Sequence, residues 1–247
     1  MNAHPLRLHG RTALVVGGGG GVGRGICAEL ARVGTRIVVA EMNPSNAETA
    51  MMELQADNRD SIAVVGDARD AADVERMFAE AEAAFGQVDI VVTCATPPLL
   101  LLGIETDNEE YRKAMVDAYV TVPLQVTARA IPGMRERGHG RIINVTSEAF
   151  ALTKHEDSEH AHWVREKAVE LATSGITVNE VVSGFIPAMR HENIPQEKKD
   201  AYFATVPMHR WGSPADVGYA CVYFASDEAA FVSGQTLVVN GARALEI

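Results

Sequence analysis

The chain is poor in positive charge, in cysteine and in long apolar runs, and each shortage excludes a class of protein. Its 22 Lys and Arg residues face 33 Asp and Glu residues, a formal charge of −11 that disfavours contact with phosphate backbones and anionic lipids. The longest uncharged apolar stretch, Ile90–Ile104, has 15 residues and contains two prolines, so it is too short to span a bilayer. We therefore expect binding neither to nucleic acid nor to a membrane.

The three cysteines, Cys27, Cys94 and Cys221, are too few and too far apart in sequence for a disulfide framework, so we expect reduced thiols. Residues 1–10 contain no apolar run of the kind that forms a secretory signal. Both features are typical of a cytoplasmic protein. Hydrophobic residues make up 47% of the chain, which is enough for a sizeable core.

Short runs rich in Val and Ile alternate with longer amphipathic segments along the whole chain. The clearest amphipathic segment is Asp70–Phe85, where apolar residues recur at helical spacing. This alternation is typical of βαβ units that build a parallel sheet, and no linker or repeat divides it. The sequence therefore predicts one α/β domain over residues 1–247, a three-layer sandwich. The seven expected strands are Thr12–Gly17, Arg36–Glu41, Ser61–Gly66, Val88–Thr93, Arg141–Thr146, Ile176–Val182 and Thr236–Asn240.

A run of glycines, 17–21 and 23, follows the first expected strand and opens a helix. Glycines at such a junction let backbone N–H groups approach a pyrophosphate at the helix N-terminus, although a merely tight turn is the plainer alternative. The second expected strand ends in Glu41, eighteen residues beyond Gly23. A carboxylate there can accept hydrogen bonds from an adenosine ribose and repel a 2′-phosphate, which predicts NAD rather than NADP.

Asp67 follows the third expected strand and is open to two interpretations. At the carboxyl end of a strand it would lie at the edge where open α/β sheets bind their ligands. It could equally cap the helix that starts near Asp70.

Seven sequence blocks, which include the glycine run and the acids after it, resemble the short-chain dehydrogenase/reductase family. The likeness runs from about Leu8 to Ala242. It implies a Rossmann-type sheet of seven parallel strands and oligomers that assemble through long helices, here roughly Tyr111–Arg137 and Ser158–Thr173. It also implies that Gly17, Gly21 and Gly23 are the cofactor glycines, with Glu41 and Asp67 beside the nucleotide. The remaining blocks are Gly86–Ile90, Gly140–Ser147, Gly175–Asn179, Arg210–Val217 and Val232–Gly241.

The sequence departs from the family pattern where the chemistry is expected. The family's Asn-Asn-Ala-Gly segment reads Thr93–Thr96 here, and Tyr119 stands where the family has a catalytic asparagine. We expect that Tyr119, unlike asparagine, does not kink its helix to hold a proton-relay water. The family's catalytic serine corresponds to Ser147, but His160 and Val164 occupy the positions of its tyrosine and lysine. None of the five tyrosines is followed four residues later by Lys or Arg.

Without a phenol beside an ammonium group, reduction of a carbonyl lacks its positioned proton donor, which costs about 10²–10⁴ in rate. A histidine is the plausible replacement, and His160 lies thirteen residues after Ser147. Its surroundings, however, are typical of a solvated loop and helix start. The candidates in this stretch are His155, His160, His162, Lys154 and Lys167, and no second cluster of ligands supports a metal site.

Three functions remain open at the level of sequence. The leading hypothesis is a catalytically silent subunit, with Ser147 as a remnant, that assembles with an active homologous subunit into a heterotetrameric NAD-dependent dehydrogenase. Its eroded motifs are similar to those of the inactive subunits of paired hydroxyacyl-CoA dehydrogenases. The second hypothesis is an active NAD-dependent oxidoreductase that uses Ser147 and a histidine. The third is a sensor that binds NAD without reacting it.

Overall fold

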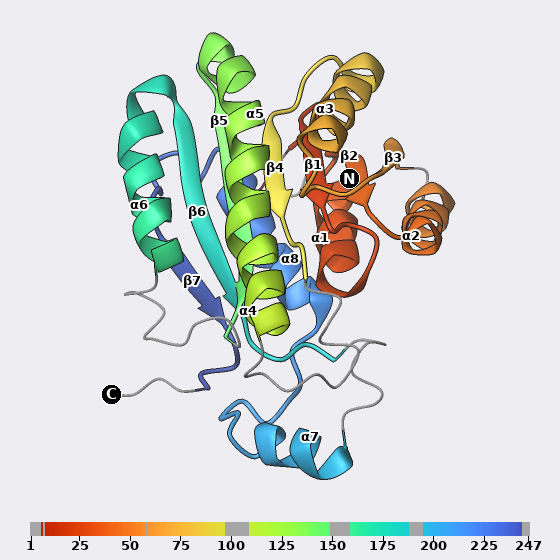
Figure 1. The fold of residues 1–247 in the computed structure, drawn as a ribbon, viewed down its shortest axis with the longest axis vertical. Helices are drawn as coiled ribbons and strands as arrows, with labels where there is room; N and C mark the ends of the chain where they lie inside the picture. The colour runs from red at the N-terminus through yellow and green to blue at the C-terminus, as the bar shows by residue number, and fades with distance from the viewer. Residues whose placement is uncertain are drawn as a thin grey trace.

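The computed structural model describes residues 6, 8–57, 59–96, 109–148, 159–187 and 195–243. Within them seven strands form one sheet in the order β3-β2-β1-β4-β5-β6-β7, and each neighbouring pair is parallel (Figure 1). This arrangement confirms the predicted α/β fold with a Rossmann-type parallel sheet. The strands are β1 (Thr12–Val16), β2 (Arg36–Glu41), β3 (Ser61–Val65), β4 (Ile90–Thr93), β5 (Gly140–Ser147), β6 (Ile176–Ser183) and β7 (Thr236–Val239).

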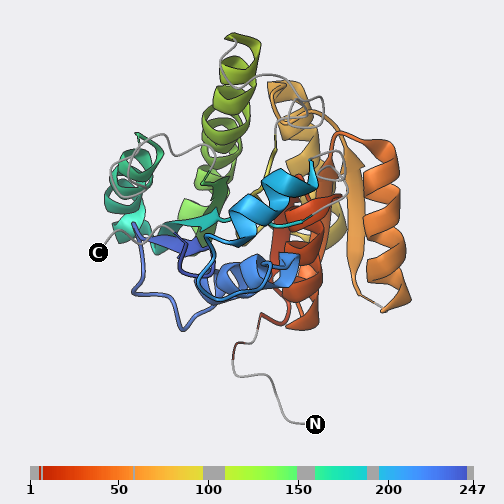
Figure 2. The same ribbon diagram turned by 90° about the horizontal axis from the view of Figure 1, so that it is seen from below.

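Helices cover both faces of the sheet and complete three layers (Figure 2). One core cluster packs α1 and α8 against the sheet, and a second packs α3, α5 and α6 against the opposite face. None of the helices in the described ranges has the length and apolar character that crossing a membrane requires. The helices are α1 (Gly21–Arg32), α2 (Pro44–Ala56), α3 (Ala71–Phe85), α4 (Glu109–Val116), α5 (Val122–Arg137), α6 (Glu159–Leu171), α7 (Gln196–Phe203) and α8 (Pro214–Ala225).

The central strands are buried on both faces, which explains their near-continuous runs of Val and Ile. Each lies within two residues of its predicted bounds, and β2 matches them. The largest difference is at β4, expected from Val88, which begins at Ile90. Asp89, directly before it, is buried, and its side-chain carboxylate accepts a hydrogen bond from the Thr12 amide at 2.9 Å.

The ends of the helices follow their local sequence. Helix α3 begins at Ala71, one residue after the predicted Asp70, because the Asp70 carboxylate accepts a hydrogen bond from the Ala72 amide at 2.8 Å and caps the helix. At α8 a capping box joins Ser213 and Asp216, with Pro214 in the first turn. These caps fix where the two helices start relative to the sheet.

All seven parallel strands end at one edge of the sheet, and α7 lies beyond that edge (Figure 1). The residues that the sequence singles out therefore gather there. They are Gly17 after β1, Glu41 at the end of β2, Asp67 after β3 and Ser147 at the end of β5.

The three cysteines are free and buried, as the sequence predicts. Burial raises the pKa of the Cys27 thiol far above its usual value, and the Cys27 sulfur lies 3.6 Å from the carbonyl oxygen of Gly18. Cys27 is therefore an unreactive packing residue beside the glycine turn.

Candidate functional site

The turn between β1 and α1 has room for glycine only. Gly17 has a φ of +77°, and a Cβ atom on it would lie 2.5 Å from the carbonyl oxygen of Cys94. A Cβ atom on Gly23 would lie 1.9 Å from the carbonyl oxygen of Gly17. The third predicted cofactor glycine, Gly21, has a φ of +49°. The chain thus turns sharply into α1 at positions where a side chain would clash with the neighbouring backbone.

The N-terminus of α1 has no side-chain cap of its own. Its N-cap is Gly20, which makes no side-chain capping hydrogen bond, and no acidic residue lies in the first turn. The first amide groups of a helix lack intrahelical partners and carry a partial positive charge. The glycine cradle and this uncapped terminus together fit the pyrophosphate of a dinucleotide.

Glu41 lies directly against the glycine turn. One carboxylate oxygen accepts a hydrogen bond from the Gly19 amide at 3.1 Å, and the other accepts one from the Asn43 amide at 3.0 Å. The residue is 8% exposed, and a Cβ atom on Gly19 would lie 2.6 Å from its Cγ. The structure therefore brings the glycines and Glu41 together, and their part in binding NAD stays a prediction.

Asp67 lies at the same edge but has an ion-pair partner. Two guanidinium nitrogens of Arg69 donate hydrogen bonds to the Asp67 carboxylate, the shortest at 2.6 Å. These hydrogen bonds lower the pKa of Asp67. The interpretation of Asp67 as the cap of α3 is wrong, because Asp70 fills that position. A nucleotide that used Asp67 would compete with Arg69 for it.

Ser147 is half-buried at the end of β5, opposite Ser183 of β6 in the sheet register. The amide of the next residue, Glu148, donates to the Ser183 carbonyl at 3.0 Å, so the two strand ends remain paired. The described chain resumes at Glu159, where α6 begins, twelve residues beyond Ser147. His160 and Val164, which stand for the family's tyrosine and lysine, lie in the first two turns of this helix.

His160 is buried, so the expectation of a solvated residue is wrong. It is 4% exposed, and its Nε2 atom makes no hydrogen bond and lies 3.7 Å from a carboxylate oxygen of Glu180. The ring also makes a hydrogen bond with the backbone of Tyr119, while burial lowers its pKa to about 4. His160 is therefore neutral at pH 7 and shielded from solvent, a poor general acid.

Two of the other proposed replacements lie on α6, and two lie outside the described residues. His162 is exposed on α6, and Lys167 pairs with Glu170 on the same helix. His155 and Lys154 lie outside the described residues. Among the described residues no group of three His, Cys, Asp or Glu is arranged to hold a metal ion.

The helix around Tyr119 is irregular, so the expectation that Tyr119 leaves its helix unkinked is wrong. Tyr119 is buried within a π-helical segment, Asp117–Thr121, between α4 and α5. Such an insertion displaces backbone carbonyls from the ordinary helical ladder, and the backbone of Tyr119 is hydrogen-bonded to His160. The helix distortion is therefore present without asparagine.

A buried polar row beneath this segment escapes the sequence analysis. Thr93, Asn144, Glu180 and Thr236 are register partners across β4 to β7. The Thr93 hydroxyl donates to Asn144 at 2.7 Å, and both the Thr146 and Thr236 hydroxyls donate to Glu180, at 2.8 and 2.9 Å. Burial raises the pKa of Glu180. Glu180, the one charged residue of the buried strand Ile176–Ser183, was the available signal.

Glu148 is the second functional candidate that the sequence analysis missed. Its carboxylate accepts hydrogen bonds from the Tyr202 hydroxyl at 3.2 Å, from the Asn240 side chain and from the Arg243 guanidinium at 2.8 Å. It therefore ties α7 and the end of β7 to the end of β5. Nothing in its local sequence marks this role, because its three partners lie 54 to 95 residues away.

Comparisons with known proteins cover nearly the whole chain. The family model described as enoyl-(acyl carrier protein) reductase matches residues 17–242. The 3-oxoacyl-[acyl-carrier-protein] reductase FabG of Staphylococcus aureus (strain N315) is 31% identical over 248 residues, which are 94% of this chain and 97% of that protein. The acetoacetyl-CoA reductase of Cupriavidus necator is also 31% identical, with the same two coverages.

Solved structures agree with these sequence relatives. A hydroxysteroid dehydrogenase from Escherichia coli superimposes with a TM-score of 0.85 at 27% identity and covers 98% of this chain and 99% of its own. The sheet order, the glycine turn and the length of these matches lead to one assignment. The chain belongs to the short-chain dehydrogenase/reductase family, and its homologues are NAD(P)-dependent oxidoreductases.

Proposed function

We propose that this chain is a catalytically silent member of its family that assembles with an active homologous subunit. The assembled protein is then an NAD-dependent alcohol dehydrogenase, and a heterotetramer is the expected stoichiometry. Two relatives, 3-oxoacyl-[acyl-carrier-protein] reductase and acetoacetyl-CoA reductase, are named for acyl thioesters. We therefore favour a hydroxyacyl-CoA as the substrate class of the assembly.

The observation that carries this proposal is the environment of His160. A carbonyl that accepts hydride needs a proton at its oxygen, and the donor must be protonated and reach the substrate. His160 meets neither condition, since it is buried against Glu180 and its pKa is lowered to about 4. Val164 is fully buried in the core and supplies no ammonium group.

The nucleotide half of the site supports retention of a dinucleotide. NAD supplies the hydride acceptor of the family's reactions when it is bound. In this chain the turn at Gly17, Gly21 and Gly23 would hold its pyrophosphate through backbone amides. Glu41 would accept hydrogen bonds from the adenosine ribose and disfavour a 2′-phosphate.

Exposed apolar side chains on the long helices support assembly with a second subunit. Val116 on α4 is 48% exposed, Leu124 on α5 is 40% exposed and Val169 on α6 is 80% exposed. Members of the family are expected to pair through these helices. Cover by a homologous subunit would remove this apolar surface from water. The set of lost motifs resembles the inactive subunit of the hydroxy(phenyl)methyl-succinyl-CoA dehydrogenase of anaerobic toluene degradation, which is the pairing we favour.

Co-expression tests the proposal. The chain is produced with a homologue of similar length that keeps Tyr-x-x-x-Lys and is encoded beside it, and each protein is also produced alone. We expect the two chains to purify together and NAD-dependent oxidation to require the homologue. Independent migration of the two chains would contradict the proposal.

The sensor hypothesis is the second candidate function. The glycines of the nucleotide turn are present, whereas the family's tyrosine and lysine are replaced by His160 and Val164. Calorimetry of the isolated chain with NAD separates the two functions. Tight binding by a chain that forms no complex with its homologue favours the sensor. A complex that forms without any heat from NAD on the isolated chain removes it.

A further inference from the structure

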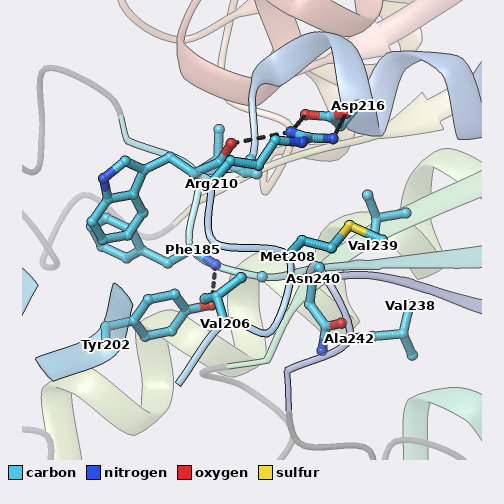
Figure 3. A pocket seen from close by; sticks show the side chains of 15 residues that line it. Phe185, Tyr202, Val206, Met208, Arg210, Asp216, Val238, Val239, Asn240 and Ala242 are labelled. Atoms are coloured by element: carbon cyan, nitrogen blue, oxygen red, sulfur yellow. Dashed lines mark hydrogen bonds and ion pairs between the residues drawn. The ribbon is translucent and has the colours of Figure 1, made fainter. Parts of the chain in front are cut away.

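A hollow of about 250 Å³ lies at the carboxyl ends of β6 and β7, away from the glycine turn. Its walls come from the segment after β6, from α7, from the approach to α8 and from the end of β7 (Figure 3). Neither the nucleotide residues nor Ser147 line it.

Aromatic rings form one wall of this pocket. Phe185, Tyr202 and Trp211 contact one another with ring centroids 5.3 to 5.9 Å apart, and Tyr202 and Trp211 are stacked with an angle of 8° between their planes. All three rings are only half-buried in the isolated chain. Met208 and Val239 add apolar surface to the lining. Water in the hollow therefore contacts apolar surface, and a ligand that displaced this water would gain binding free energy by burying that surface.

The charged groups at the pocket are neutralised by one another. Arg210 and Asp216 form two short contacts of 2.7 and 2.8 Å (Figure 3), and this pair holds the pKa of Asp216 well below its usual range. Glu148, behind the wall, is paired with Arg243. A charged ligand in this hollow would thus lose hydration without gaining a free counter-charge from the described lining.

The aromatic wall is held in place before any ligand arrives. The Tyr202 hydroxyl accepts a hydrogen bond from the Phe185 amide at 2.7 Å and donates to Glu148 at 3.2 Å. The Arg243 guanidinium lies 4.5 Å from the centre of the Tyr202 ring. A ligand would therefore enter a preformed pocket and lose little affinity to ordering of the wall.

The size of the hollow limits what it can hold. An apolar protein cavity of about 150 Å³ is large enough for benzene. A space of about 250 Å³ therefore accommodates one ring with a short substituent. Flat aromatic walls favour a ring over a branched aliphatic group, because rings stack offset or edge to face.

We infer that this pocket binds a small uncharged molecule, or an uncharged part of a larger one, that carries a single apolar ring. The inference does not depend on the proposed function, because no residue of the nucleotide turn takes part. It assigns to α7 and the end of β7 a ligand site that is separate from the cofactor site.

Trp211 is a direct reporter of occupancy. The chain has two tryptophans, and Trp163→Phe leaves Trp211 as the only one. Trp163 tolerates this change because its indole nitrogen makes no hydrogen bond. Three ring compounds of similar size, anisole, benzoate and benzylammonium, are added to the Trp163→Phe variant while the fluorescence of Trp211 is followed. We expect saturable binding of anisole and binding of both ions that is weaker by about ten-fold or more.

Two variants with matched controls locate the binding. Val239→Phe fills the pocket and should abolish the anisole response, whereas Val65→Phe on the opposite edge strand should leave it unchanged. Met208→Lys places a cation at an exposed lining residue and should shift the preference toward benzoate, whereas Met52→Lys on α2 should not. Because Met208 is 62% exposed, its variant decides the question even if Val239→Phe fails to fold.

Three outcomes would overturn the inference. The first is the absence of a saturable response to anisole at its solubility limit. The second is equal binding of the neutral and charged rings. The third is a self-associated chain in which Trp211 is shielded and insensitive to all three compounds, which would make the pocket part of a protein interface.

Discussion

At the scale of single residues, two buried acids on separate strands of the sheet, Glu41 on β2 and Glu180 on β6, have different environments. Glu41 accepts hydrogen bonds from two backbone N–H groups at the glycine turn. Glu180 accepts hydrogen bonds from two threonine hydroxyl groups in the interior, and burial raises its pKa. The first acid is placed to meet a ligand, whereas the second is shielded with His160.

Substitution of Glu41 tests the predicted preference for NAD. Glu41→Gln keeps an oxygen that can accept the Gly19 amide but removes the charge that disfavours a 2′-phosphate. We expect the ratio of NAD to NADP affinity, measured by calorimetry, to fall about ten-fold. The exposed Glu48→Gln on the following helix is the control. Equal affinity of the unaltered chain for both nucleotides would refute the assignment.

Substitution of His160 tests its buried, neutral state. The unfolded chain protonates this residue below pH 6.5, its ordinary pKa, but the folded chain does so only below about pH 4. The unfolding free energy should therefore decrease as the pH falls through this interval, by at most about 3 kcal/mol from this residue. Urea unfolding should show a flatter pH dependence in His160→Leu. The exposed His162→Ala should keep the original slope, and an unchanged slope in His160→Leu would disprove the explanation.

At the scale of elements, the local sequence predicts where helices start and which residues recur on their apolar face. It predicts contacts between residues far apart in the chain less well. The periodicity of Val74, Met77 and Phe78 locates α3, and Asp70 caps it. The sequence also places the glycine turn and Glu41 correctly at one edge. It misses Glu148, whose partners lie far away in the chain, and it misjudges His160, whose burial depends on the packing of α6 against β6. Tertiary contacts of this kind have no periodic signal.

The cap of α3 gives a test of one element. Asp70→Ala removes the acceptor for the Ala72 amide and should lower the free energy of unfolding by about 1 kcal/mol. Chemical denaturation measures this change. Asp60→Ala, at an exposed position before β3, should change stability by less than half as much. Equal effects of the two substitutions would mean that Asp70 is not the cap.

The attachment of α7 gives a second test. Glu148→Gln weakens the contacts with Tyr202 and Arg243 that hold this helix against the sheet edge. We expect the α7 amides to exchange hydrogen about ten-fold faster, since charged hydrogen bonds contribute about 1.5–3 kcal/mol. Glu228→Gln, an exposed change after α8, serves as the comparison. Unaltered exchange in α7 would show that Glu148 does not hold it.

At the scale of the whole molecule, the family fold is complete, while His160 and Val164 occupy two positions where the resemblance implies a tyrosine and a lysine. The seven-stranded sheet and its two helix layers match those of active relatives over nearly the full chain. The glycine turn remains in one half of the sheet edge. In the other half, α6 begins with a buried histidine and a core valine. These features are the ones on which the proposed role as a non-catalytic subunit rests.

Assembly through the long helices can be tested on the co-expressed complex. Val169→Asp places a charge on the most exposed apolar position of α6, so association with the homologous subunit should weaken strongly. Sedimentation should then show separate chains. The same substitution at Val65, on the edge strand β3, should leave the complex intact. A complex that survives Val169→Asp would place the interface elsewhere.

The most direct measurement is the turnover rate of the chain purified alone, with NAD and 3-hydroxybutyryl-CoA. The reductase FabG of Staphylococcus aureus, assayed with its own substrate and cofactor, controls for assay sensitivity. Our account predicts a rate at or near background for the isolated chain and activity only with its homologue present. A steady rate comparable to that of an ordinary family member, free of contaminating enzyme, would contradict it, and loss of that rate in His160→Leu would assign the proton transfer to His160.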